Sequence, residues 1–144
     1  MNCTEPIEPQ NMGVASECRI QMPFGLLGFE QLKSFALVAN PQEEPFLWLQ
    51  AIEEPKLAFL VMSPFAVVPD YQPEIPEEEE RALGLQGSNE TLIFNIVTMR
   101  GAEQATVNLK GPIVLNRRTL VAKQIIPLNA PHLPVAHPLP LQQP

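Results

Sequence analysis

The sequence predicts a mainly β protein: a small antiparallel β-barrel-like domain with one short inserted helix, at about residues 76–84. About eight short apolar and β-branched runs follow one another at close spacing, a pattern typical of an antiparallel barrel or sandwich. The 17 prolines among 144 residues argue against a helical bundle, because proline removes a backbone donor and breaks long helices.

Length and proline content define the expected domain organisation. A chain of 144 residues is long enough for one domain with one core. We expect residues 1–13, which are polar, to form a poorly ordered N-terminal segment, and residues 14–127 to form a single barrel-like domain. Residues 128–144 are expected to form a proline-rich extended tail.

The first half of the domain contains four expected strands. Gly25 and Gly28 stand between large apolar residues and predict a tight chain reversal after the first strand. The polar stretch at Glu54-Pro55 predicts a hairpin between the third and fourth. The four strands are expected at residues 14–22, 35–39, 46–52 and 57–62.

A further apolar run, residues 65–68, lies in a segment punctuated by four prolines between positions 64 and 76. Proline cannot donate to a strand ladder, so a strand in this segment is expected at a sheet edge. Such an edge can pair with another chain, although the prolines could also serve only to protect it.

The helix is predicted by its end signals. Pro76 suits the first helical position, Glu77–Glu80 suit the positive N-terminal end, and Gly84 suits the stop. Glu77 and Arg81 are spaced to pair. The acidic run has two compatible interpretations: it stabilises a solvated helix start, or it contacts a basic partner.

The second half of the domain returns to strands. The run at residues 91–99 is rich in β-branched residues and is the strongest strand signal of the chain. Residues 116–118 predict the turn between the last two strands. The remaining strands are expected at residues 105–109, 112–115 and 120–126.

Charge is unevenly distributed along the chain. The net charge is −7, and residues 41–90 hold eleven Asp or Glu against Lys56 and Arg81, which gives −9 for this part. An acidic surface repels nucleic acid and attracts a basic protein. It could also serve only for solubility.

No arrangement typical of catalysis stands out. His132 and His137 lie in the proline-rich tail without Cys, Asp or Glu beside them, so we expect neither a metal site nor a cofactor. Trp48, the single tryptophan, is expected in the core, with a ligand platform as the alternative. The N-terminus lacks the pattern of a signal peptide and no apolar run approaches the ~20 residues of a membrane span, so a cytoplasmic protein is expected.

Four blocks of the sequence resemble the flagellar assembly factor FliW family, in matching order from about residue 18 to 139. The sequence GLLGFE is like the GxPGFE of the family, with Leu27 in the place of its usual proline. The other blocks lie farther along the chain. The four blocks are residues 25–30, residues 45–71, residues 75–85 followed by 91–98, and residues 105–116 followed by 123–126.

The resemblance implies a small, β-barrel-like, non-enzymatic cytoplasmic protein that binds flagellin and, alternatively, CsrA, a translational repressor. Flagellin accumulating in the cell would occupy the protein and leave CsrA free to block flagellin translation. After flagellin export the protein would sequester CsrA. No direct contact with nucleic acid or membrane is implied, and a monomer is expected.

Charge, the proline-punctuated edge and position in the matching block together predict the partner-binding residues. Tyr71 is expected to be an aromatic anchor, with acidic residues around it as a rim. The predicted set is Phe65, Asp70, Tyr71, Glu74, Glu77, Glu78, Glu79 and Glu80.

Two other functions remain as alternatives. A small-molecule-binding β-barrel or a hydrolase of unknown substrate would need a polar-lined cavity, whereas the expected strands are apolar. An oligonucleotide-binding barrel would need basic residues interleaved with aromatics. The charged residues around the aromatics from Phe46 to Tyr71 are mainly acidic.

Overall fold

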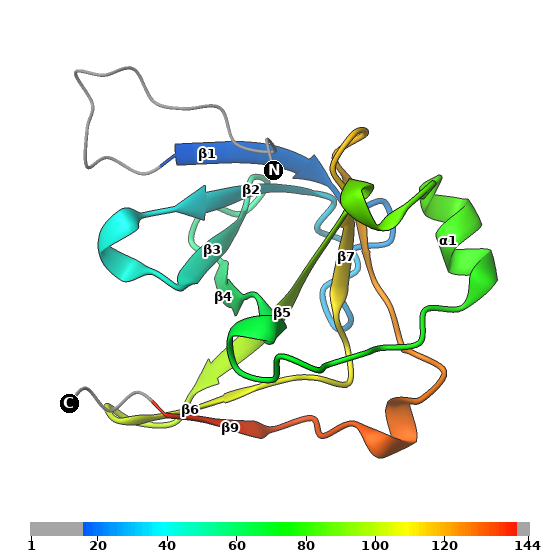
Figure 1. Ribbon diagram of the computed structural model, residues 1–144. Helices are drawn as coiled ribbons and strands as arrows, with labels where there is room; N and C mark the ends of the chain where they lie inside the picture. The colour runs from blue at the N-terminus through cyan, green and yellow to red at the C-terminus, as the bar shows by residue number, and fades with distance from the viewer. Residues whose placement is uncertain (1–15, 141–144) are drawn as a thin grey trace.

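Seven strands close into a barrel, and two more extend its sheet on one side (Figure 1). The computed structural model describes residues 16–140, and within this range it contains nine strands, one α-helix and four short 3-10 helices. The strands are β1 (Ser16–Gln21), β2 (Ser34–Ala39), β3 (Phe46–Ala51), β4 (Ala58–Met62), β5 (Thr91–Met99), β6 (Gln104–Val107), β7 (Ile113–Asn116), β8 (Val121–Gln124) and β9 (His137–Pro140). The helices are α1 (Glu77–Leu83), η2 (Pro41–Glu43), η3 (Pro64–Ala66), η4 (Ser88–Glu90) and η5 (Ala130–His132).

The barrel follows the order β4-β3-β2-β1-β8-β7-β5, and pairing of β4 with β5 closes it. The described strand pairs are antiparallel except β1 with β8, which are parallel at Gln21 and Val121. Val97 of β5 pairs with both Leu60 of β4 and Val107 of β6. Strands β4 and β6 therefore lie on opposite edges of β5, and β6 with β9 projects from the barrel. The mainly β fold with one short helix is confirmed.

Alternation along the strands fills the barrel. Cys18 and Ile20 of β1 are buried, whereas Arg19 between them is exposed. The largest side chains of the interior include Phe35 of β2 and Phe94 of β5. A second apolar cluster lies where β5, β6 and β9 leave the barrel, and a third lies under α1. The barrel interior is thus packed with side chains.

The predicted chain reversal after the first strand is confirmed. Gly25 has φ +66°, and a Cβ there would lie 2.6 Å from the Cα of Glu30, so only glycine fits. The backbone N–H of Gly28 donates to the Glu30 carboxylate at 3.0 Å. This hydrogen bond lowers the pKa of Glu30.

The helix starts one residue later than its signals suggest. Pro76 occupies the N-cap position with an extended ψ of 142°, and its carbonyl accepts from the N–H groups of Glu79 and Glu80. The predicted stop is confirmed: Gly84 adopts φ +68°, and its N–H donates to the carbonyl of Arg81. The helix is therefore short, at 7 residues.

Two local predictions were wrong or incomplete. The run at residues 65–68 forms no edge strand: Pro64 begins η3 instead, and an irregular segment continues to α1, since proline at the first position favours such a turn. The tail was expected to be extended, but residues 130–132 form η5, and residues 137–140 pair with β6 as β9. Two prolines in β9 are tolerated because β9 lies at an edge. The expected N-terminal segment 1–13 lies outside the described residues.

Candidate partner-binding surface

The segment from η3 to α1 crosses the outside of the barrel beside β5 and β7 (Figure 1). Strand β5 has apolar residues on both faces: Phe94 and Ile96 pack in the barrel, whereas Ile93 packs outside it. An apolar outer face must be covered to leave water. Residues 63–76 and α1 supply part of that cover, and this is why the chain runs here.

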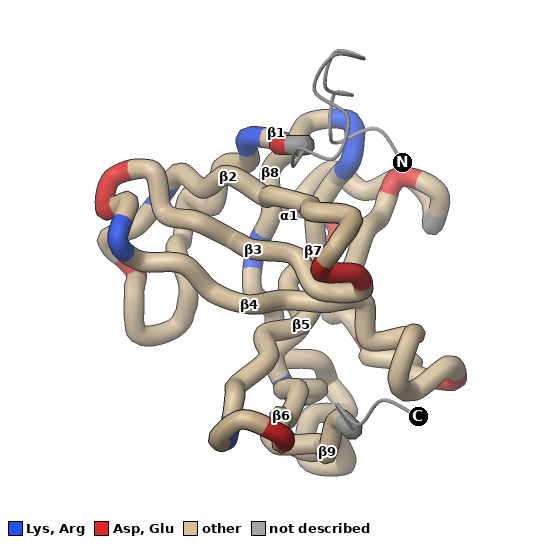
Figure 2. Tube along the Cα trace, turned by 90° about the vertical axis from the view of Figure 1, so that its left-hand side faces the viewer, with Lys and Arg blue, Asp and Glu red and all other residues tan. Residues whose placement is uncertain are grey.

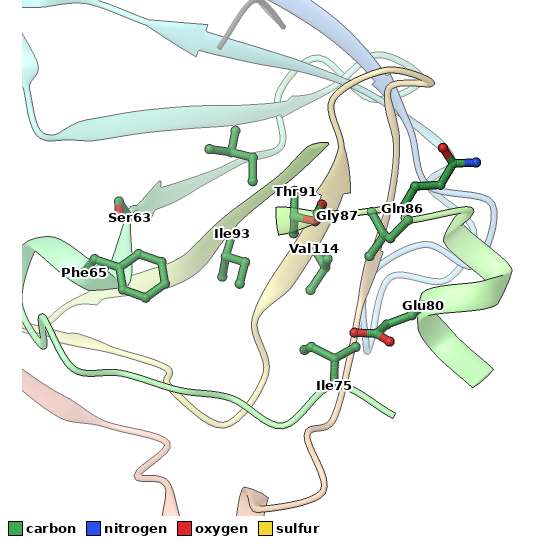
Figure 3. Close-up of a pocket in the computed structure, with 11 residues that line it drawn as sticks. Ser63, Phe65, Ile75, Glu80, Gln86, Gly87, Thr91, Ile93 and Val114 are labelled. Atoms are coloured by element: carbon green, nitrogen blue, oxygen red, sulfur yellow. Dashed lines mark hydrogen bonds between the residues drawn. The ribbon is translucent and has the colours of Figure 1, made fainter. Parts of the chain in front are cut away.

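The cover is incomplete and leaves a groove of about 560 Å³ between η3, α1, β5 and β7. Phe65 faces Ile93 across this groove, Ile75 lies below them, and the Glu80 carboxylate reaches in from α1 (Figure 3). The floor is apolar and the rim is polar. The lining residues are Ser63, Phe65, Ile75, Glu80, Leu85, Gln86, Gly87, Thr91, Leu92, Ile93 and Val114.

Tyr71, predicted as the aromatic anchor of the surface, is buried. It is 5% exposed, and its hydroxyl donates to the Leu109 carbonyl at 2.6 Å. The Nδ2 of Asn95 donates to the same hydroxyl at 3.4 Å and to the Asn108 carbonyl at 2.7 Å. Burial raises the pKa of Tyr71. The turn that closes with the Tyr71 N–H donating to the Val68 carbonyl directs this side chain inward.

Phe65 is the aromatic side chain that the surface presents. Its ring is 42% exposed, and its centroid lies 6.0 Å from that of Tyr71. Removing the exposed part of this apolar ring from water lowers the free energy of a complex in which a partner covers it. The buried ring of Tyr71 is therefore a packing neighbour of Phe65.

The four glutamates at the start of α1 do not act as one cluster. Successive helical residues point about 100° apart. Glu79 turns toward the barrel and pairs with Lys123 of β8 at 2.7 Å, the two side chains being 22% and 25% exposed. Glu80 lines the groove, whereas Glu77 and Glu78 are exposed. Glu79 is thus a structural residue, and its three neighbours carry negative charge on the surface.

Asp70 and Glu74 belong to a second hollow, of about 430 Å³, on the other side of Tyr71. The backbone N–H of Glu74 donates to the Asn129 side chain at 2.9 Å, and the Glu74 carbonyl accepts from the Leu128 N–H at 2.7 Å. The Asn129 Nδ2 also donates to the Gln72 carbonyl at 3.0 Å, so these bonds tie residues 72–74 to the tail. Of the predicted residues, Phe65 and Glu80 share the groove, and Asp70, Tyr71 and Glu74 share the second hollow.

Sequence reasoning missed the groove floor. Ile75, Ile93 and Val114 form much of it, and none of them was singled out as a binding residue. A signal did exist: the run TLIFNIV at residues 91–97 has apolar residues on both faces of a strand, so its outward positions need a cover that the chain or a partner must supply.

No group of three or more His, Cys, Asp or Glu side chains within residues 16–140 is placed to hold a metal ion. Within the same range, no helix has the length and apolar character needed to cross a membrane. What the surface offers is an apolar groove with carboxylates beside it.

Comparison with known proteins identifies the family. The model of the FliW protein family matches residues 7–139. The chain belongs to this family. A flagellar assembly factor FliW of Leptospira interrogans serovar copenhageni is 42% identical over 123 residues, which cover 84% of this chain and 82% of that protein. The FliW of Caldanaerobacter subterraneus is 40% identical over 117 residues, covering 80% and 77%.

A solved structure agrees with the fold. A crystal structure of a flagellar assembly factor FliW superposes with a TM-score of 0.74 at 26% identity, covering 92% of this chain and 88% of that one. The resemblance recognised from four sequence blocks is thereby confirmed. The match to the family model ends at residue 139, so it includes β6 and all of β9 except Pro140.

Proposed function

We propose that this FliW-family chain is a non-enzymatic, cytoplasmic flagellar assembly factor that binds flagellin and, alternatively, the translational repressor CsrA. Bound flagellin leaves CsrA free to repress flagellin translation. When flagellin is exported, the chain sequesters CsrA and relieves that repression. The chain acts as a monomer, by exchange of partners, and contacts neither nucleic acid nor membrane.

The observation that supports this proposal most is the groove around Phe65. Protein interfaces place aromatic side chains at an apolar centre and charged groups at the rim. Phe65 is 42% exposed above a floor that includes Ile75 and Ile93, and Glu80 stands at the edge. Covering such a ring contributes on the order of 1 kcal/mol or more to binding.

Charge around the groove supports a basic partner surface. Residues 41–90 hold eleven acidic residues against two basic ones, and Glu77 and Glu78 are exposed next to the groove residue Glu80. Acidic groups of this kind accelerate encounter with a basic protein and select against acidic ones. We propose Asp70 and Glu74 as the outer part of the same surface, with Tyr71 and Glu79 holding it in shape.

The test is calorimetric titration of the purified chain with CsrA, with flagellin, and with each in the presence of the other. We expect binding to both partners and mutual exclusion. Phe65→Ala should weaken binding of at least one partner by about tenfold or more, a loss typical of an interface anchor. Glu54→Ala, in an exposed turn between β3 and β4, is the control for a generally altered surface.

Three outcomes distinguish the parts of the proposal. Binding to flagellin alone would leave a flagellin chaperone and remove the switch. Simultaneous binding of both partners would refute mutual exclusion. If charge reversal at Glu77, Glu78 and Glu80 leaves both affinities and their salt dependence unchanged, the electrostatic argument is wrong.

The alternative of a small-molecule-binding barrel or a hydrolase needs a polar-lined cavity. The barrel interior is instead filled by side chains such as Phe35, Leu49 and Phe94, each fully or almost fully buried.

A further inference from the structure

Another hollow, apolar and of about 440 Å³, lies on the outer face of β3, β4 and β5, apart from the hollow at Asp70 and Glu74. Strand alternation shows why it faces outward: Leu49, Val61 and Ile96 pack into the barrel core. Trp48 and Leu60 each adjoin one of these residues along a strand and are therefore directed away from the core. Met99, an odd number of positions after Ile96 in β5, lines the same outer hollow. The hollow is lined by Gln42, Glu43, Glu44, Phe46, Trp48, Leu60 and Met99. Among the described residues, none lines both this hollow and the groove at Phe65.

Outward positions of a barrel strand ordinarily carry polar residues, but here they carry a tryptophan and a methionine. Trp48 is 37% exposed and Met99 is 48% exposed. Neighbouring large apolar side chains left in water indicate a surface that something covers.

The hollow is acidic along one side. Helix η2 and the residue after it place Glu43 and Glu44 beside the apolar floor, in the red turn that joins β2 to β3 (Figure 2). The indole N–H of Trp48 donates to the Glu43 carboxylate at 3.1 Å, which fixes the carboxylate next to the ring. Asn40 holds the turn, since its side chain accepts from the Gln42 N–H at 3.0 Å. No Lys or Arg is among the described residues that line the hollow.

We propose that this hollow, named here the Trp48 site, binds an arginine side chain presented by a partner protein. The aliphatic stem of arginine would lie on Leu60 and Met99, as long basic side chains do on apolar surface. The guanidinium would stack on the indole of Trp48 and pair with the carboxylates of Glu43 and Glu44.

Charge and shape together select this occupant. An apolar side chain would cover the floor but would also desolvate two carboxylates without pairing them, which is unfavourable. A lysine ammonium would satisfy the charge, but it lacks the planar face that stacks on an indole and the fork that pairs with a carboxylate. Arginine satisfies the ring, the floor and the carboxylates at once.

The single tryptophan makes the test specific, because the one indole N–H resonance and the tryptophan fluorescence both report on Trp48. The probes are three acetylated and amidated Gly-X-Gly peptides, with X as arginine, lysine or citrulline, at constant ionic strength. Citrulline has the shape of arginine without its charge. We expect a saturable shift of the indole resonance with arginine, a weaker one with lysine, and none with citrulline.

Two variants locate the effect. Glu44→Gln and Glu43→Gln each remove one charge, and the second keeps an oxygen that accepts from the Trp48 N–H. Each variant should lower the affinity for the arginine peptide by about tenfold, the loss expected for one charged hydrogen bond. Glu54→Gln, the same change in an exposed turn, should leave the affinity unchanged.

The proposal is overturned if the indole resonance does not respond to the arginine peptide, or if it responds equally to arginine and citrulline. It is also overturned if Glu54→Gln weakens binding as much as Glu44→Gln. Circular dichroism confirms that each variant is folded. The experiment uses neither flagellin nor CsrA, so its outcome is separate from that of the proposed partner switch.

Discussion

Replacing Tyr71 by phenylalanine separates support of the surface from contact with a partner. The change removes one hydroxyl and keeps the ring that lies 6.0 Å from Phe65. In the folded chain this hydroxyl donates to the Leu109 carbonyl at 2.6 Å in a buried setting. Its loss leaves that carbonyl without this donor, at a cost of about 1–3 kcal/mol.

The second hydrogen bond of the hydroxyl adds little to that figure. Asn95 donates to Tyr71 at 3.4 Å, a long contact, and keeps its 2.7 Å bond to the Asn108 carbonyl after the change. The net loss is therefore that of one strong buried hydrogen bond. For a domain of this size each kcal/mol lowers the melting temperature by about 4 °C.

Differential scanning calorimetry and partner titration together test the reasoning. Tyr71→Phe should lower the melting temperature by several degrees and leave partner affinity almost unchanged. Phe65→Ala should weaken partner binding and change the melting temperature little, because Phe65 is 42% exposed and its ring is available to a partner. An unchanged melting temperature in Tyr71→Phe would refute the role of the buried hydroxyl. A large loss of affinity in Tyr71→Phe would restore Tyr71 as a direct contact.

Three further predictions concern single sites. Burial raises the pKa of Tyr71, the only tyrosine. The stability that the buried hydroxyl contributes is therefore complete below the unfolded pKa and is lost as pH rises through the folded pKa. Tyrosinate absorbance should appear only above the usual tyrosine range and together with unfolding. Glu79→Gln breaks the partly buried pair with Lys123 and should lower the free energy of unfolding by about 1–3 kcal/mol in urea titration, whereas the exposed Glu78→Gln should change it by less than about 0.5 kcal/mol. Gly25→Ala should lower it by about 1–3 kcal/mol or more in the same titration, because φ is +66° and the added Cβ meets backbone; a wild-type value would refute the tight reversal.

Most of the fold was predictable because its signals are local. The run at residues 91–99 forms a strand of the predicted length, and the glycines at 25 and 84 mark a reversal and a helix end as predicted. Residues 65–68 were mistaken for strand because an apolar run does not reveal that its preceding proline starts a 3-10 turn. Strand β9 was not predicted because its pairing with β6 depends on distant contacts.

The site was only partly predictable, for a different reason. Composition places two aromatic residues among acids near positions 65–80, but it cannot decide which of them faces water. That choice depends on the Leu109 and Asn95 groups that satisfy the Tyr71 hydroxyl, and both are far from it in sequence. Exposure of Phe65 follows once Tyr71 takes the buried position.

The groove at Phe65 and the Trp48 site have a common physical origin in the outer face of the barrel. The outward residues of β3, β4 and β5 are apolar over much of their length, so they must be covered or remain in water. The irregular segment after β4 and helix α1 cover the part near Ile93, with Phe65 at the border of that cover. They leave the part at Trp48 and Met99 uncovered. Because acids border both parts, a basic partner fits either hollow, and the choice between them depends on whether the partner presents an apolar segment or an arginine.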